Sequence, residues 1–173
     1  MITGEELKKI MPFASIAKIN TFVTPLNAAM QEFGINTPLR EAAFVAQLAH
    51  ESGGFHYVRE LASGEAYEGR ADLGNTVPGD GVRFKGRGLI QITGRNNYRD
   101  CGDALGLDLI GAPELLESPA NACRSAAWFW KTRHLNELAD KSDFVAITKK
   151  INGGTNGLND RLAYYDRAKI ALA

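Results

Sequence analysis

The chain has 173 residues, enough for one domain with a buried core, and 45% of them are hydrophobic against 23% charged. Basic and acidic residues both number 20, so the formal net charge is zero, which argues against a nucleic acid or an anionic membrane as partner. No segment approaches the roughly 18 apolar residues of a membrane span, and residues 1–11 lack the apolar run of a secretory signal, so we expect synthesis in the cytoplasm.

The N-terminal part of the chain predicts helices. Thr3 and Glu6 have the spacing of a capping box, which begins a short helix. Apolar residues then recur every three or four positions from residue 15 to residue 33, which indicates an amphipathic helical stretch. Because proline disrupts the interior of a helix, Pro25 predicts a break that divides this stretch into two helices.

The next predicted helix carries an acid on its apolar face. Residues 37–38 are a threonine N-cap followed by a proline at the first helical position. Glu51 shares a face with Phe44 and Leu48, since the three recur at i, i+4 and i+7. The glycine pair at 53–54 predicts the end of the helix directly after this acid.

The middle of the chain is rich in glycine. Residues 61–88 show no sustained period, which predicts a long ordered loop or a short β-hairpin region. Loops of this length in a compact domain are often functional. Residues 86–94 follow as a short β-prone run between glycines.

The C-terminal half predicts four more helices. Apolar residues surround the second of them on nearly all sides, so we expect it at the buried centre. The fold class expected is therefore α+β, mainly helical, with a small β or loop element in a single domain. The helices are expected from Asn96 or Asn97 to Leu105, after Ser118-Pro119, from Ser142 to Asn152, and from about Asn159.

The cysteines and histidines do not form a metal-binding pattern. Cys101 and Cys123 belong to no CxxC motif, and we interpret them as buried thiols rather than as a disulfide. His50 and His56 flank Glu51, but a zinc-protease helix needs its two histidines at i and i+4. We expect no metal and no cofactor.

Glu51 and Glu60 are a candidate carboxylate pair. In one continuous helix, nine positions would place them on opposite faces, but the glycines between them allow the chain to reverse. A glycosidase needs one carboxyl group kept protonated by apolar surroundings and one that is ionised. Glu51 suits the acid and Glu60, on a solvated loop, suits the base. The alternative is that both are ordinary surface charges.

Five motifs occur in order along the chain: AHESGGF from Ala49, FKGRGLIQITGRNNY from Phe84, AAWFW from Ala126, ING from Ile151 and NDRLAYY from Asn159. Together they resemble glycoside hydrolase family 19, which contains plant-type chitinases and a branch of phage and prophage endolysins. The resemblance runs from about residue 35 to the C-terminus, and it implies a lysozyme-like fold with a central cleft. It divides the domain, 1–173, into N-terminal helices at 1–35 and a catalytic core at 36–173.

The resemblance assigns a role to each matching residue. It implies that Glu51 is the general acid, that Glu60 is the general base and that Thr93 helps to hold the attacking water. Gln91 would line the cleft, Asn97, Tyr98 and Asn152 would contact sugar, and Arg161 would pair near the acid or the base. Each of the last three has a structural alternative: Tyr98 as a core residue, Asn152 as a helix C-cap and Arg161 as a purely structural ion pair.

The base assignment has rivals within the sequence. Plant members of the family have a longer segment between the two acids, so acids of the glycine-rich loop are rivals of Glu60. These rivals are Glu65, Glu68 and Asp72, and the polar residues expected to grip substrate in or near this loop are Arg70, Asn75 and Arg87.

The function expected from this resemblance is that of an endolysin. It would hydrolyse the β-1,4 bond between N-acetylmuramic acid and N-acetylglucosamine in peptidoglycan with inversion, which requires carboxyl groups about 6.5–9.5 Å apart. We expect a monomer that binds no nucleic acid and stays in the host cytoplasm until a holin-type pore releases it to the cell wall. The alternatives are a chitinase, a lytic transglycosylase and a non-catalytic wall-binding module.

Overall fold

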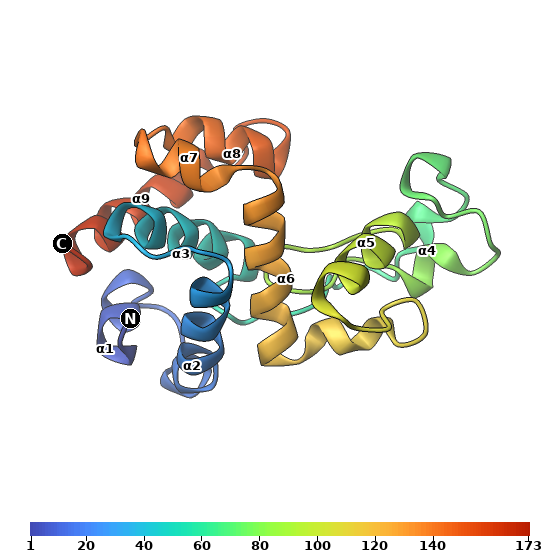
Figure 1. Ribbon diagram of the computed structural model, residues 1–173, viewed down its shortest axis with the longest axis horizontal. Helices are drawn as coiled ribbons and strands as arrows, with labels where there is room; N and C mark the ends of the chain where they lie inside the picture. Colours follow the sequence, from blue (N-terminus) through green and yellow to red (C-terminus); the bar gives the residue numbers. More distant parts are fainter.

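The computed structural model describes residues 1–173 and shows a larger and a smaller lobe on either side of helix α6, Pro119–Thr132 (Figure 1). Phe33 and Phe129 pack against the hydrophobic cores of both lobes, so the lobes form one folded unit. The larger lobe holds α1 (Gly4–Ile10), α2 (Ile16–Glu32), α3 (Pro38–Ser52), α7 (Leu135–Asp140), α8 (Phe144–Asn152) and α9 (Leu158–Ala171); the smaller holds the 3₁₀ helices η1 (Glu65–Tyr67), η2 (Ala71–Leu73) and η3 (Pro113–Glu117) with α4 (Asp80–Arg83) and α5 (Arg95–Leu105).

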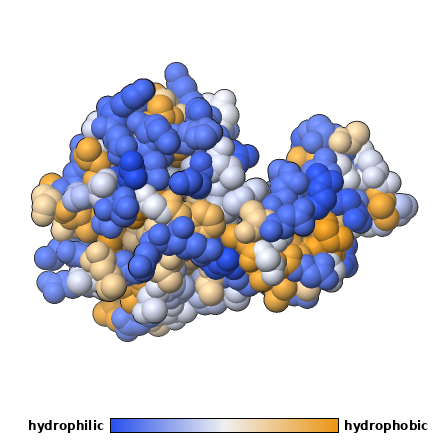
Figure 2. All heavy atoms as spheres, viewed as in Figure 1, coloured by the Kyte–Doolittle hydropathy of each residue, from blue (hydrophilic) through white to orange (hydrophobic).

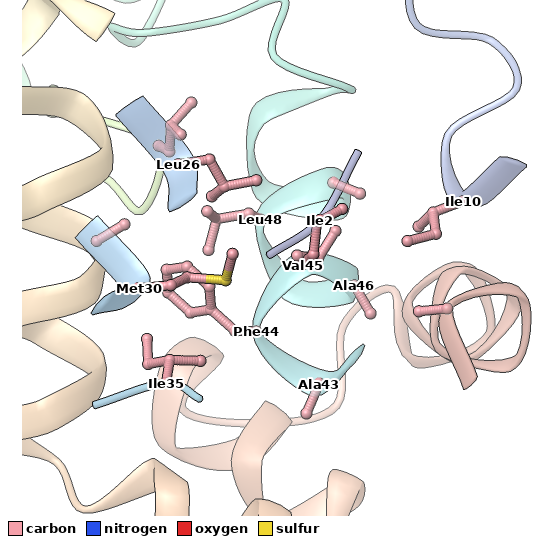
Figure 3. Packing of buried hydrophobic residues seen from close by; sticks show 14 of the residues in the cluster. Ile2, Ile10, Leu26, Met30, Ile35, Ala43, Phe44, Val45, Ala46 and Leu48 are labelled. Atoms are coloured by element: carbon pink, nitrogen blue, oxygen red, sulfur yellow. The ribbon is translucent and has the colours of Figure 1, made fainter. Parts of the chain in front are cut away.

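Helix α3 is the buried centre of the larger lobe. The threonine at 37 caps it as predicted, and every residue from 42 to 49 is buried. Phe44 points toward Met30 of α2 and Ala46 toward α9, so side chains leave the helix on different sides (Figure 3). Alanines allow α9 to approach closely, and the ring of Phe44 meets the edge of Trp130 from α6 at 5.2 Å between centroids. Glu51 therefore lies near the end of a helix whose position is fixed by packing on all sides.

Helix α2 runs unbroken through Pro25, so the predicted break is wrong. Proline removes one backbone hydrogen bond, to the carbonyl of Thr21, but Thr21 is exposed and water can satisfy that oxygen. Phe22 and Leu26, on either side of the proline, are both buried in the same core and hold the two halves in line. With 17 residues α2 is the longest helix, and none of the helices is both long enough and apolar enough to cross a membrane.

The smaller lobe contains no strand, so the β-hairpin that was one expectation for its loop did not form. Its β-prone run makes only isolated bridges, between Arg59 and Arg87 and between Arg87 and Ile92. Gly88, with φ 95°, explains this, because a left-handed residue ends an extended strand. A Cβ at Gly88 would lie 2.7 Å from the Ser125 hydroxyl of α6, so glycine also permits the loop to pack on that helix.

Each lobe has its own hydrophobic core, and each core contains one cysteine. Cys123 lies in the core of the larger lobe and Cys101 in that of the smaller. Both are buried free thiols, as the sequence predicted, and burial raises the pKa of each to about 12. The seven buried residues of the smaller core are Phe84, Ile92, Tyr98, Cys101, Leu105, Leu109 and Leu116.

Candidate active site

The chain reverses sharply after helix α3. Gly53, Gly54 and Phe55 all have left-handed backbones, with φ of 58°, 69° and 67°. Phe55 is the unusual member, since bulky residues rarely adopt this conformation. Its buried ring stacks on Phe22 at 4.8 Å between centroids, and its N–H donates to the Ser52 hydroxyl at 2.9 Å. These contacts hold the reversal that returns the chain from Glu51 toward the smaller lobe.

Glu51 is held by an arginine. Nη1 of Arg161, a buried residue of α9, lies 2.7 Å from Oε1 of Glu51, which confirms the pairing expected near one of the two acids. The same nitrogen donates to Oε1 of Gln47 at 2.7 Å, and the arginine Nε donates to the Asn156 carbonyl at 3.0 Å. The surroundings of Glu51 are therefore not simply apolar, as the sequence suggested, but include a fixed cation.

Glu60 is anchored on the loop that crosses to the smaller lobe. Its Oε1 accepts from the Gly86 N–H at 2.6 Å, and its Oε2 accepts from the Tyr67 hydroxyl at 3.1 Å. Its own N–H donates to the Gly86 carbonyl at 2.9 Å. Burial, and then the hydrogen bond to Glu60, raise the pKa of Tyr67 above its ordinary value. The carboxylate thus has one defined orientation.

Glu51 and Glu60 line the same open hollow, which we call the carboxylate hollow. A neighbouring hollow continues from it, since Gln91 lines both, and together they form a cleft between residues of the two lobes. Figure 2 shows the surface of the molecule indented between the two lobes. The carboxylate hollow is lined by Glu51, Tyr57, Arg59, Glu60, Leu61, Ala62 and Gln91, and the neighbouring hollow by Leu73, Gln91, Ile92, Thr93, Asn97, Trp128, Phe129 and Arg133.

The comparison with known proteins identifies the family of this site. Residues 21–153 match the family model Glyco_hydro_19, described as chitinase class I. A Haemophilus influenzae glycosyl hydrolase family 19 domain-containing protein is 30% identical over 95% of this chain and 94% of its own length. The chain belongs to glycoside hydrolase family 19. It is a glycoside hydrolase that cleaves glycosidic bonds as chitinase-like enzymes do.

Plant relatives and solved structures agree with this family. An endochitinase of Arabidopsis thaliana is 40% identical over 72% of this chain, which spans 44% of that protein. Chitinase C of Streptomyces griseus matches 99% of the chain with TM-score 0.80 at 23% identity, over 76% of its own chain. A bacterial family 19 chitinase matches 99% of it with TM-score 0.82 at 24% identity, over 95% of its own chain. These structures share the lysozyme-like fold expected from the sequence.

Three of the residues predicted to bind sugar or water lie in the cleft of this family 19 enzyme. Gln91 is exposed where the two hollows meet. Thr93 and Asn97 line the neighbouring hollow, and the Asn97 amide donates to the Thr93 carbonyl at 2.8 Å. This bond ties the start of α5 to the loop before it and fixes the Asn97 side chain along the cleft wall.

Tyr98 does not lie in the cleft, where the resemblance placed it in contact with sugar. Its side chain is fully buried in the smaller core, and its hydroxyl bonds to the Arg87 guanidinium and to the Lys85 carbonyl. Burial raises its pKa far above the ordinary value. A sugar cannot reach this side chain, so the expected contact is wrong and the alternative of a core residue holds.

Asn152 lies outside both hollows. Its side-chain oxygen accepts from the Asn156 N–H at 3.3 Å, so it closes the loop after α8. The carbonyl of Asn156 in turn accepts from Arg161. In this conformation Asn152 acts on the site through the loop that helps to hold Arg161, which is closer to its alternative as a helix-end residue than to a sugar contact.

None of the rival acids lines the carboxylate hollow. Both oxygens of Glu68 accept from backbone N–H groups, at Gly79 and Gly81, and Asp72 pairs with Arg70 at 2.6 Å on the surface. Glu65 is exposed on η1. Glu60 is thus the acid that the fold brings to the same hollow as Glu51.

Two of the residues expected to grip substrate are structural instead. Asn75 is 1% exposed and bridges the Tyr67 carbonyl and the Arg95 N–H. Arg87 is largely buried and pairs with Glu117 at 3.0 Å. Neither can reach a ligand in the cleft.

Of the residues that support the two acids, only Gln47 has a signal in the sequence. Gln47 stands one turn before Glu51 on the apolar stripe, where a polar residue needs a partner. Tyr67 and Gly86, which hold Glu60, come from a loop with no periodicity, so only the folded chain reveals their contact. Arg133 follows the AAWFW motif and carries no signal of its own.

Proposed function

We propose that this enzyme cleaves the β-1,4 bond between N-acetylmuramic acid and N-acetylglucosamine in peptidoglycan by an inverting mechanism. The observation that carries the proposal is the presence of Glu51 and Glu60, from separate elements, in one open hollow. Two carboxyl groups across a glycosidic bond are the minimum that inversion needs. Family 19 membership supports the reaction type.

In the proposed mechanism Glu51 protonates the glycosidic oxygen as the bond breaks. The carboxylate left behind stays 2.7 Å from the Arg161 guanidinium, whose charge stabilises it. On the opposite face of the sugar a water oriented by the Thr93 hydroxyl bonds to the anomeric carbon and gives a proton to Glu60. Exchange with solvent then removes this proton and restores the one that Glu51 donated. The two hydrogen bonds that fix Glu60 supply the positioning that proton transfer requires.

Peptidoglycan is the substrate we favour, and chitin is the second candidate. The bacterial relative from Haemophilus influenzae corresponds to the chain over nearly its whole length. The plant relatives, by contrast, are named endochitinases, and the chain spans less than two thirds of each of those we compared. Chitin shares the β-1,4 linkage and the acetamido groups, so the same two carboxyl groups would serve both polymers.

The first prediction is that Glu51→Gln loses about 10²–10⁴-fold in activity without unfolding. Purified peptidoglycan and colloidal chitin are digested with the wild type, Glu51→Gln and Glu60→Gln, and new reducing ends and thermal midpoints are measured. Asp72→Asn is the control, since this acid lies on the surface outside the hollow. Proton NMR of the first product reports the anomer, which should be inverted.

The other outcomes of this digestion decide against the proposal in different ways. Full cleavage by Glu51→Gln would remove the acid from its role. Anhydro-sugar ends would indicate a lytic transglycosylase, and binding to the wall without new reducing ends would indicate a wall-binding module. Cleavage of chitin alone would make the enzyme a chitinase.

We also propose the cellular role of an endolysin that acts as a monomer. The enzyme would accumulate in the host cytoplasm and reach the wall through a holin-type pore. Expression in bacteria with and without a pore-forming protein tests this role, since lysis should require both. Light scattering tests the monomer. Lysis without the pore would contradict the proposed route.

A further inference from the structure

Arg133 lies in the cleft beside residues expected to contact sugar. It directly follows α6 and lines the neighbouring hollow together with Gln91, Thr93 and Asn97. Its guanidinium stands 3.6 Å from the centroid of the Phe129 ring, so a cation–π contact holds it against the wall. The hollow contains no acidic residue, and the positive charge there is not balanced.

Arg133 is the one arginine whose side chain makes no hydrogen bond or ion pair within the protein. Every other arginine donates to a carboxylate or to a backbone carbonyl. The residue is nevertheless only partly exposed, and burial lowers its pKa below the ordinary value. The fold therefore partly withdraws a charged group from water in a cleft and gives it an aromatic ring but no hydrogen-bond acceptor or anion.

A ligand can supply what the protein does not. A guanidinium carries five N–H donors in a planar fork that matches a carboxylate, and such pairs are shorter and stronger than neutral hydrogen bonds. Chitin is uncharged and offers Arg133 no carboxylate. Peptidoglycan carries carboxylates on its stem peptides, and on its lactyl groups wherever a peptide has been removed. The positive charge of this hollow thus provides a means to distinguish peptidoglycan from chitin, which the two carboxyl groups do not.

We propose that Arg133 binds a carboxylate of the glycan substrate and thereby favours peptidoglycan over chitin. This inference rests on the proposed function and adds to it the residue that recognises the acidic polymer. Arg133 is a binding residue in this scheme and takes no part in proton transfer.

The second prediction concerns the ratio of kcat/KM on peptidoglycan to kcat/KM on a neutral chitin oligosaccharide. Arg133→Gln should lower this ratio at least about tenfold, mainly through KM on peptidoglycan, because one charge-assisted pair is lost. Arg133→Lys keeps the charge but loses the planar fork, so it should retain part of the ratio and lie between the wild type and Arg133→Gln. Lys131→Gln is the matched control, since this exposed cation lies on the same helix end outside the cleft.

Three substrates separate the sources of the carboxylate. Intact peptidoglycan presents peptide carboxylates, amidase-treated glycan strands present the lactyl carboxylate, and carbodiimide-amidated strands present neither. The inference is supported if the wild type prefers a carboxylate-bearing substrate to the carbodiimide-amidated strands and Arg133→Gln does not. Whether that preferred substrate is intact peptidoglycan or the amidase-treated strands identifies the source. Binding of soluble muramyl oligosaccharides to Glu51→Gln, with and without Arg133→Gln, gives the same answer without turnover.

Failure of the inference and failure of the proposed function look different. A wild type that cleaves peptidoglycan, with a ratio unchanged in Arg133→Gln, would overturn the role of Arg133 alone. An equal fall on charged and neutral substrates would show that Arg133 only supports the cleft wall, and would also overturn it. A wild type that cleaves chitin but not peptidoglycan would overturn the proposed function itself.

Discussion

Glu51 owes its orientation to a chain of buried polar groups that ends in another helix. Gln47 accepts from Arg161 with its oxygen, and its Nε2 donates to the Thr148 hydroxyl at 2.9 Å. The Thr148 hydroxyl donates in turn to the Phe144 carbonyl within α8. All of these buried polar atoms have a partner, so the network can be rigid rather than costly.

The third prediction is that Gln47→Leu destabilises the protein by about 1–3 kcal/mol and lowers kcat. Leucine leaves Arg161 with one acceptor fewer in the interior, and an unsatisfied buried donor costs free energy. Glu51 then loses part of the frame that positions it. Urea unfolding and kcat are measured beside Gln31→Leu, whose side chain is exposed on α2 and should stay within about 0.5 kcal/mol. Equal stability of the two variants would contradict the prediction.

The residues of the site could be predicted from the sequence only in part. Asn97 and Tyr98 fall in the same motif, yet one residue of helix rotates the side chain by about 100°, so one faces the cleft and the other the core. A motif match does not tell which of the two side chains faces the cleft. Glu51 and Glu60 do lie in one hollow and Arg161 does pair with Glu51, while their roles in the reaction stay predictions.

Among the elements, the reversal after α3 has the largest effect on the site. Three left-handed residues in succession, beginning two residues after Glu51, turn the chain and bring residues 57–60 to the cleft. The glycine pair predicted this end of the helix. The predicted break at Pro25 was wrong because packing of Phe22 and Leu26 outweighs the loss of one exposed hydrogen bond. The apolar period does continue through the proline, but a local pattern does not show which of the two effects is larger.

The fourth prediction compares two glycines with nearly equal backbones. Gly54→Ala places a Cβ 3.1 Å from Cβ of Ala14 at φ +69°, whereas Gly34→Ala, at φ +72°, meets nothing within 4 Å. Both substitutions carry the strain of a left-handed residue, about 1–2 kcal/mol. Gly54→Ala should cost more and should also reduce kcat, because it shifts the reversal that positions Glu51. Both variants are compared by thermal unfolding. Equal losses of stability would show that the contact with Ala14 adds no cost and would contradict the prediction.

In the whole molecule the smaller lobe combines its small core with a buried ion pair between Asp80 and Arg95. Asp80 is 1% exposed and accepts from Nε and Nη2 of Arg95, both at 2.8 Å. The hydrogen bond from Arg95 holds the pKa of Asp80 below its ordinary value, which more than offsets the effect of burial. The α4 region and the start of α5 are joined through this pair, opposite the lobe that carries Glu51.

The fifth prediction follows from this shift in pKa. Since the pKa of Asp80 is lower in the folded than in the unfolded protein, its stabilisation is complete above about pH 4 and is lost as the pH falls through the folded value. Asp80→Asn should cost about 3 kcal/mol at pH 7 and should flatten the decline in acid. Unfolding from pH 7 to pH 2 is compared with that of the exposed Asp103→Asn. A decline as steep in Asp80→Asn as in the wild type would contradict this role.

The two cysteines give the molecule a pair of built-in reporters. Cys123 and Cys101 lie in different cores, and each thiol is unreactive while its core is closed, because burial both shields it and suppresses the thiolate. A thiol reagent therefore marks whichever core has opened. The order in which the two are modified records whether the lobes open together or the smaller one loosens first, without any label being added to the chain.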